Sequence, residues 1–199
     1  MINLNKVSFL IHFFLCLFYS KLILASVEEI VVLGDWKEIS SDKKDASIVL
    51  LGSKEIDDQA VNHFEELSYL VPNLNFAASD SRARYFQIRG IGERSGYQGT
   101  PNSSVGFLID DIDYSGQGGI ATTFDIDQVE IHRGPQGSRI GANALAGLIY
   151  IKTKDPTKEF ESTGRLVLGS YGRKSIGLAA GGPLQINNDV TYRLSLIHI

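Results

Sequence analysis

The sequence predicts an α+β domain followed by a run of antiparallel strands. Composition gives the first support: 43% of the 199 residues are apolar, and twenty glycines against five prolines favour a β-rich, loop-rich architecture over a helix bundle. The second is residues 129–156, where two strand-like runs flank a glycine-dense middle. The third is the alternation of apolar and polar side chains in residues 162–170, 174–182 and 190–196.

The first 25 residues have the composition of a signal peptide. A lysine precedes an apolar run, residues 7–19, that is shorter than the roughly 20 residues a membrane-spanning helix needs. Ala25 offers a small residue at a cleavage position before Ser26, and an uncleaved N-terminal anchor is the alternative. The only cysteine, Cys16, lies in this leader, so the rest of the chain has no disulfide framework and no thiolate metal site. We therefore expect export.

Charge and motifs exclude several classes of function. The formal net charge of −4 gives no basic patch for nucleic acid. The chain has no HExxH, GxSxG or P-loop motif and no carboxylate constellation of a carbohydrate-active enzyme, so we expect neither catalysis nor a cofactor. Asp111 and Asp113 copy the start of a calcium loop, but its twelfth position is Thr122 instead of a bidentate glutamate, so no metal site is expected.

The domain itself combines a strand, a helix and the glycine-rich segment. Residues 46–51 form a short apolar run typical of a strand, and residues 56–70 carry apolar side chains at three- to four-residue steps, which predicts an amphipathic helix. In residues 129–156, Pro135 presets φ for a turn with a glycine on each side. So much glycine favours a loop whose backbone presses closely against something else.

Residues 129–156 resemble the C-terminal part of the plug domain of TonB-dependent outer-membrane receptors. The pattern V-E-V-x-R-G-P-Q-G and its continuation are followed, with Ile140 in place of an aromatic and Ala146 in place of a glycine as mild departures. The residues in step are Val129, Glu130, Arg133, Gly134, Pro135, Gln136, Gly137, Gly141, Ala144, Gly147, Ile149, Ile151, Thr153, Lys154 and Pro156.

Three further segments resemble the same family. Residues 84–92 resemble its F-x-I-R-G-x-G motif, and residues 105–114 resemble a hairpin in which Asp111 replaces the turn glycine. Residues 70–74 resemble a third motif, with Asn73 where a glycine often stands. Both Asp111 and Asn73 tolerate the left-handed backbone that these turns need.

The resemblance implies a division into four parts. These are a signal peptide (1–25), a TonB box with its linker (26–44), a plug domain with a small mixed sheet, short helices and long loops (45–156), and the first strands of an antiparallel transmembrane β-barrel (157–199). Alternation alone would equally fit a soluble β-meander. Because a plug-like domain precedes these strands, the resemblance favours the barrel. Three strands cannot close a barrel, so we expect a truncated product or a fragment of a longer reading frame.

The resemblance also implies site residues. A β-branched run at the mature N-terminus resembles the TonB box, which the partner TonB binds as an added strand; the alternative is the first strand of a domain. Its residues are Glu29, Ile30, Val31, Val32 and Leu33. The polar loop 93–104 would face the substrate through Arg94, Tyr97 and Gln98.

Two motif arginines, Arg89 and Arg133, would lie inside the barrel, where a buried charge needs a carboxylate partner. They either join the plug to acids of the barrel wall or pair within the plug, for instance with Glu130. The motif residues expected at this site are Arg89, Gly90, Glu130, Arg133, Gly134, Pro135, Gln136 and Gly137.

The function implied is energised uptake of a scarce, large nutrient across the outer membrane, with an iron–siderophore as the expected ligand and TonB as the expected partner. The alternative is a soluble periplasmic binding module made of the plug alone. The motifs do not identify the substrate, because siderophore, haem, cobalamin and glycan receptors share them.

Overall fold

A computed structural model of the chain describes residues 31–33, 39–40, 47–59, 62–78, 82–95, 102–184 and 187–198. The chain divides into two compact units, Met1–Ile30 and Val31–Ile199, and every described residue belongs to the second. The predicted leader therefore lies outside the described residues. The same holds for Glu29 and Ile30 of the expected TonB box and for Tyr97 and Gln98 of the expected substrate loop.

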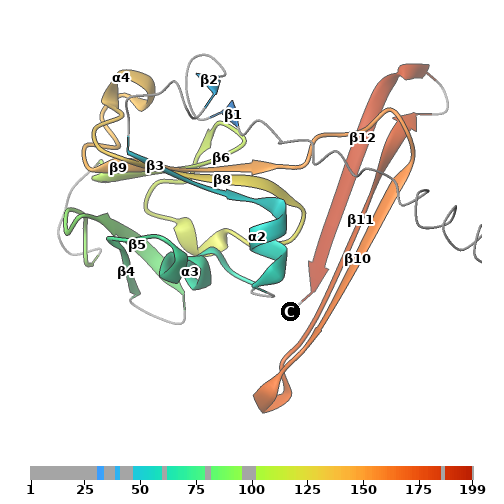
Figure 1. Cartoon of the computed structure of the whole chain (residues 1–199), viewed down its shortest axis with the longest axis horizontal. Helices are drawn as coiled ribbons and strands as arrows, with labels where there is room; N and C mark the ends of the chain where they lie inside the picture. The colour runs from blue at the N-terminus through green and yellow to red at the C-terminus, as the bar shows by residue number, and fades with distance from the viewer. Residues whose placement is uncertain are drawn as a thin grey trace, which may run out of the picture. The chain divides into compact units, whose positions relative to one another are not determined.

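A five-stranded mixed sheet carries both strands of the glycine-rich motif (Figure 1). Its order is β3 (Ile48–Gly52), β8 (Ile126–Arg133), β9 (Gly147–Thr153), β6 (Val105–Ile109) and β7 (Ile112–Asp113). Neighbouring strands are antiparallel except β6 and β9, which are parallel. The α+β domain with a small mixed sheet is thus confirmed.

The sequence of β8 gives this sheet two different faces. Successive side chains of a strand point to opposite faces, so Val129 and Ile131 share one face while Gln128, Glu130 and His132 share the other. The register pairs Ile131 with Ile149 and His132 with Leu148 of β9. Over residues 128–132 of β8, one face of the sheet is therefore apolar and the other is polar.

Two short helices and a hairpin cover the apolar face (Figure 1). They are α2 (Ser53–Asp58), α3 (Phe64–Leu67), β4 (Leu74–Ala78) and β5 (Ala83–Ile88). Phe64 and Phe86 pack edge to face with their centroids 5.2 Å apart, and Phe107 of β6 stacks on Phe86 at 5.4 Å. These three rings are at most 4% exposed, so they form the centre of the core.

The prediction of one amphipathic helix over residues 56–70 was wrong. The structure has α2, then α3, then a 3₁₀ turn, η2 (Ser68–Leu70). His63 between them is extended (φ −132°, ψ 147°) and bridges to Thr122, while the N–H of Thr123 donates to the carbonyl of Asn62. Pairing with this distant segment interrupts the helix. No helix in the described ranges is long and apolar enough to cross a membrane.

Two residues predicted to adopt left-handed backbone do so. Asn73 has φ 64°, and Asp111 has φ 68° in the turn between β6 and β7. Asp110 beside it also has a positive φ, 46°, and its carboxylate accepts from the N–H and hydroxyl of Thr153 at 3.0 and 2.6 Å. The acidic turn therefore ties the β6–β7 hairpin to the end of β9.

A second sheet follows the domain, made of β10 (Glu161–Leu168), β11 (Lys174–Leu184) and β12 (Asn187–His198) in antiparallel order. On β11 the buried positions are small residues, Ser175, Gly177 and Ala179, while Ile176 and Leu178 between them are exposed. A Cβ at Gly177 would lie 2.9 Å from the ring of Phe124, so only glycine fits there.

Candidate functional site

The described part of the expected TonB box lies on the polar face of the five-stranded sheet. Val31 and Val32 form β1 (Val31–Val32), which pairs antiparallel with β2 (Ile39–Ser40). Val32 is fully buried. Leu33 packs against an apolar cluster on this face, whose members are Leu108, Ile140, Ala144, Leu148 and Tyr150. This N-terminal segment is thus an integral layer of the domain in the structure.

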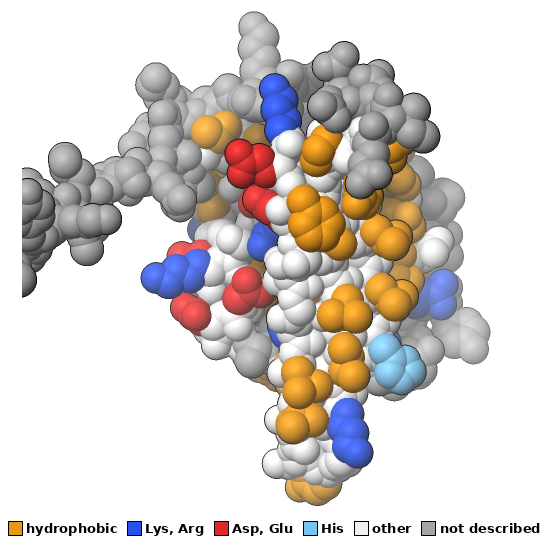
Figure 2. Space-filling view, turned by 90° about the vertical axis from the view of Figure 1, so that its right-hand side faces the viewer, with side chains coloured by type: hydrophobic (Ala, Val, Ile, Leu, Met, Phe, Trp, Pro, Cys, Tyr) orange, Lys and Arg blue, Asp and Glu red, His pale blue; other side chains and the backbone are white. Residues whose placement is uncertain are grey.

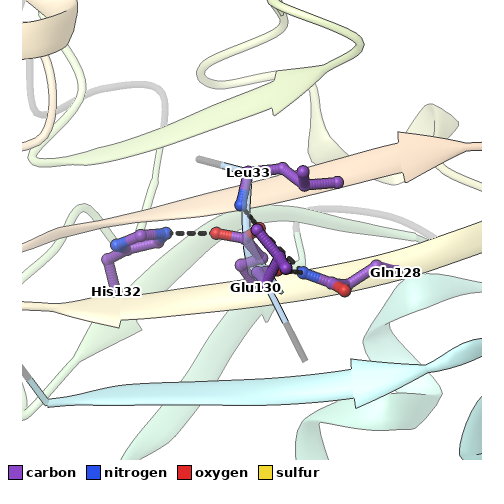
Figure 3. Close-up of polar contacts among 5 residues, drawn as sticks. Leu33, Gln128, Glu130 and His132 are labelled. Atoms are coloured by element: carbon purple, nitrogen blue, oxygen red, sulfur yellow. Dashed lines mark hydrogen bonds and ion pairs between the residues drawn. The ribbon is translucent and has the colours of Figure 1, made fainter. Parts of the chain in front are cut away.

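Three polar residues of β8 hold this segment (Figure 3). The N–H of Leu33 donates to Oε1 of Glu130, and the side-chain amide of Gln128 donates to the carbonyl of Val31 at 2.9 Å and to Oε1 of Glu130 at 2.9 Å. His132 Nε2 lies 2.7 Å from the other carboxylate oxygen, Oε2. We call Gln128, Glu130 and His132 the strand seat.

Burial makes the strand seat unusual. Glu130 and His132 are both 0% exposed, and a buried carboxylate is tolerated only when its oxygens are hydrogen-bonded. His132 Nδ1 has no hydrogen-bond partner among the described residues, so a tautomer with its proton on Nε2 satisfies the contact to Glu130. Glu130 is therefore hydrogen-bonded to His132, to Gln128 and to the N–H of Leu33.

Sequence reasoning listed Glu130 as a motif residue but missed Gln128 and His132. The signal was available, because the three polar residues alternate at period 2 on a strand whose other positions are Val129 and Ile131. Such a pattern predicts a strand with one polar face. The sequence could not predict which segment lies on this polar face, since Leu33 and Glu130 are 97 positions apart in the chain.

The glycine-rich turn that follows β8 closes over the same face. Gly134 has φ 142°, and its N–H donates to the carbonyl of Ala146 at 3.0 Å; the N–H of Gln136 donates to the carbonyl of Ala144 at 2.9 Å. A single helical turn, α4 (Gly137–Ile140), comes next. A Cβ at Gly147 would lie 2.3 Å from the carbonyl oxygen of His132, so the expected close backbone approach occurs there.

The two motif arginines, Arg89 and Arg133, form no side-chain hydrogen bond or ion pair with the strand seat among the described residues. Arg89 is exposed with φ 55°, and its N–H donates to the carbonyl of Asn73 at 2.9 Å, while Gly90 has φ 81°. Arg133 is half-buried, its N–H donates to Ser47, and its Nε is buried without a hydrogen-bond partner among the residues described. Neither guanidinium forms an ion pair with a carboxylate of the described residues.

The base of the expected substrate loop is fixed by Glu93. Glu93 is only 8% exposed. Its carboxylate accepts hydrogen bonds from the N–H of Ser104 at 3.0 Å and from the hydroxyl of Ser104 at 2.6 Å. Gln87 donates to the Glu93 carbonyl at 3.1 Å. Arg94, the next residue, is exposed. Glu93 and Ser104 thus hold together the two ends of the segment that the sequence assigned to ligand contact.

The second sheet contacts the domain through arginines. Arg193 of β12 makes a bidentate pair with Asp125, with contacts of 2.9 and 2.5 Å, and both side chains are less than 10% exposed. Arg165 of β10 lies 3.8 Å from Asp57, and Arg173 lies 3.5 Å from Glu66. A cavity of about 320 Å³ is lined by residues of both parts, Asp125 and Arg193 among them. In these pairs the acids belong to the domain, and the arginines belong to β10, β12 and the loop between β10 and β11.

Two ionisable groups of the domain, His63 and Lys152, have shifted pKa values. Burial, reinforced by the nearby charge of Arg82, lowers the pKa of His63 below its ordinary value. The hydrogen bond that Lys152 donates to Asp155 raises the pKa of Lys152. No group of three or more His, Cys, Asp or Glu side chains in the described ranges is arranged to hold a metal ion.

Comparison with known proteins agrees with this geometry. The TonB-dependent Receptor Plug Domain family matches residues 41–148. The ferripyoverdine receptor of Pseudomonas aeruginosa is 26% identical over 148 residues, which are 74% of this chain and 18% of that receptor. The pesticin receptor of Yersinia pestis is 28% identical over 118 residues, which are 59% of this chain and 17% of that receptor.

A solved structure has the same fold. The ferripyoverdine receptor of the Pseudomonas aeruginosa outer membrane, bound to ferripyoverdine, superposes with a TM-score of 0.69 at 22% identity, covering 84% of this chain and 22% of that one. The chain belongs to the TonB-dependent receptor plug domain family, and its fold is a plug domain followed by the start of an antiparallel β-barrel. It spans less than a fifth of the length of the two curated relatives.

Proposed function

We propose that this protein serves energised uptake of an iron–siderophore across the outer membrane, with its plug domain closing the path and TonB as its partner. Family membership supports the receptor class. The ligand class is supported by the relative named as a ferripyoverdine receptor and by the solved receptor bound to ferripyoverdine. Members of this family are receptors and transporters, and we assign the protein no catalytic role.

The observation that carries the proposal is the aliphatic outer face of the second sheet, joined directly to a plug domain (Figure 2). Leu166, Leu178, Leu194 and Leu196 are 58–71% exposed. Arg193, on the opposite face of β12, is paired with the domain. Strands that are apolar outside and polar inside suit a lipid surface, because a soluble sheet would expose its polar side to water.

The N-terminal segment is the proposed TonB-binding strand. An added strand is recognised mainly through backbone hydrogen bonds, which a β-branched pair such as Val31 and Val32 tolerates well. Glu29, Ile30 and Leu33 belong to the same proposed segment. Its pairing with β2 supports the proposal, since the segment already takes extended, strand-pairing backbone in the structure.

The ligand is proposed to contact the loop that begins at Arg94, through Arg94, Tyr97 and Gln98. The hydrogen bonds between Glu93 and Ser104, which fix the two ends of this loop, support the proposal. Arg89 and Arg133 are proposed to join the plug to carboxylates of the barrel wall. The unpartnered, buried Nε of Arg133 among the described residues supports a partner elsewhere.

The test is uptake of a ⁵⁵Fe-labelled siderophore by iron-starved cells that express the protein, with and without a protonophore. Val32→Pro removes a backbone N–H from the strand, and Val32→Ile is the matched control. We expect uptake that stops with the protonophore or with Val32→Pro and continues with Val32→Ile. Accumulation of the protein in the soluble periplasmic fraction, with no energised uptake, would favour the soluble binding module instead.

A further inference from the structure

We infer that Thr123, Phe124 and Asp125 form a register lock, a contact that fixes one alignment of the domain on β10, β11 and β12. These three residues form the turn that leads into β8. Each of them meets a different strand of the second sheet: Thr123 contacts β10, Phe124 packs on β11 and Asp125 pairs with β12. The inference goes beyond the proposed function and does not depend on the ligand.

The central contact places the ring of Phe124 over a glycine of the sheet. Arg165 of β10 and Gly177 of β11 lie directly opposite each other in the register, so they share one face. A Cβ at Gly177 would lie 2.9 Å from three atoms of the ring, and the guanidinium of Arg165 lies 5.2 Å from the ring centroid. This guanidinium also donates to the carbonyl and the hydroxyl of Thr123, both at 3.4 Å. An arginine opposite a glycine thus makes a pit with a cationic rim, which an aromatic ring fills.

The contact with β12 repeats this arrangement. Arg193 lies opposite Gly181 of β11, again an arginine facing a glycine. Its guanidinium makes the bidentate contact with Asp125, and the two side chains are 9% and 6% exposed. A bidentate pair fixes the orientation of its partners as well as their distance. It therefore adds direction to the contact that the ring makes.

The domain braces the turn from two sides. The N–H of Thr123 donates to the carbonyl of Asn62, and the N–H of Lys154 donates to the carbonyl of Asp125, both at 3.1 Å. Thr123 and Phe124 are buried, and Asp125 has φ 63°, which turns the chain between the ring and β8. The turn is therefore a fixed part of the domain, and the strands must fit it.

The neighbouring alignments fail because they bring the wrong side chains to the turn. Every second residue of a strand faces the same side, so a slip of two residues would bring Ser175 or Ala179 of β11 to the place of Gly177. Both carry a Cβ, for which the ring leaves no room. The same slip would replace Arg193 by a threonine or a serine, and neither offers a carboxylate two N–H donors. A displaced domain therefore returns to its own position on the strands and not to the next one.

Disulfide mapping tests the alignment in outer-membrane vesicles that contain the protein as the cell makes it. Phe124→Cys is combined, in a Cys16→Ser background, with Ser175→Cys, Gly177→Cys or Ala179→Cys. A Cβ at position 177 would lie 2.9 Å from Cγ of Phe124, so a sulfur near the place of that Cγ is within reach of a disulfide. We expect mass spectrometry to find the linked peptides at position 177 with several times the yield of positions 175 and 179. Equal yields at the three positions would overturn the lock.

A double-mutant cycle tests whether the ring and the glycine act together. Ala179→Cys, at a position 4% exposed on the same face as Gly177, reports separation of the sheet from the domain through its rate of thiol labelling. We expect Gly177→Ala and Phe124→Ala each to raise this rate several-fold. The double variant should raise it no more than the larger single effect, because the new methyl group takes space that the ring has left. Gly164→Ala is the matched control, since its Cβ would make an ordinary contact, 3.6 Å from Leu178.

A second reporter separates opening of the interface from unfolding of the domain. Ile149→Cys is 0% exposed in the apolar core, and its labelling should stay absent in every variant. Where a variant does label it, the domain has unfolded and the disulfide map alone decides. Independent effects, in which the double variant multiplies the two single ones, would overturn the inference, as would an equal rise with Gly164→Ala.

Discussion

The two faces of the five-stranded sheet use the same strands in different ways. On β8, Val129 and Ile131 face a dry core sealed by three phenylalanine rings, whereas Glu130 and His132 face a short strand from the other end of the chain. The apolar face gains its stability from large buried areas. The polar face is held by directed hydrogen bonds to a short segment from the other end of the chain. One sheet thus combines a face closed by packed side chains with a face closed by directed bonds.

The largest expected effect is the loss of stability when a ring is removed from the core on the apolar face. Phe107→Ala removes a ring that is 1% exposed and contacts both Phe64 and Phe86. We expect the free energy of unfolding to fall by about 3–5 kcal/mol, from lost burial and the cavity left behind. Urea denaturation followed by tyrosine and tryptophan fluorescence measures it. Ile112→Ala, at a side chain 59% exposed, should cost well under half as much; equal losses would contradict a core centred on Phe107.

The next effect concerns the joint between the domain and the second sheet. Arg193→Met leaves the carboxylate of Asp125, 6% exposed, without its bidentate partner. Breaking one side of such a pair costs about 3–5 kcal/mol, and this joint should lie near the lower end because Asp125 borders a cavity that water can enter. The double variant Arg193→Met with Asp125→Asn should recover part of the loss in denaturation, since asparagine also tolerates φ 63°. No recovery would mean that the pair contributes little.

A matched pair on β9 compares the two faces directly. Ile149 and Leu148 are neighbours, both 0% exposed, but Ile149 belongs to the large apolar core and Leu148 to the smaller cluster against which Leu33 packs. We expect Ile149→Ala to lower the free energy of unfolding by about 4 kcal/mol and Leu148→Ala by about 2 kcal/mol, because a cavity in the smaller cluster, beside a short segment, can collapse more readily. The denaturant midpoints of the two variants measure these losses. A larger loss in Leu148→Ala than in Ile149→Ala would contradict the view that the apolar face contributes more to stability.

The smallest expected effect is a pH dependence of stability that comes from His63, between the helices that cover the apolar face. Burial and Arg82 lower the pKa of His63 below its ordinary value of about 6.5, so the folded state favours the neutral ring. The stability of the plug should therefore be complete above pH 6.5 and decline as the pH falls below it, toward the lower pKa of the folded state. In His63→Gln the denaturation midpoint should fall less between pH 7.5 and 5.5 than in the parent protein. An identical pH dependence would exclude His63 as its source.

Much of the fold was predictable because it rests on local patterns. Alternation placed the strands, and the turn residues Asn73 and Asp111 took the left-handed backbone expected of them. The helix over residues 56–70 failed because apolar spacing cannot reveal that His63 pairs with Thr122, 59 positions away in the chain. Nonlocal pairing overrides a helical period wherever it gives the backbone another set of hydrogen bonds.

The site was predictable in only part of its residues and in none of its contacts. The motif named Glu130 and Arg133, and the segment around Val32 was recognised as an extended strand. Their meeting could not be inferred, because a carboxylate on a strand can bond any nearby N–H and the partner here comes from the far end of the chain. The contacts of Arg165, Arg173 and Arg193 with acids of the domain could not be inferred for the same reason.

Hydrogen exchange at the Leu33 amide tests most directly whether the side chains of β8 hold the N-terminal segment. The rate is compared with that of the Ile131 amide in the parent protein and in Glu130→Leu, by mass spectrometry of peptides that separate the two. We predict that Leu33 is protected in the parent, less strongly than Ile131, and loses its protection in Glu130→Leu while Ile131 keeps its own. A Leu33 amide that exchanges equally fast with and without the Glu130 carboxylate would contradict the docking of this strand by β8.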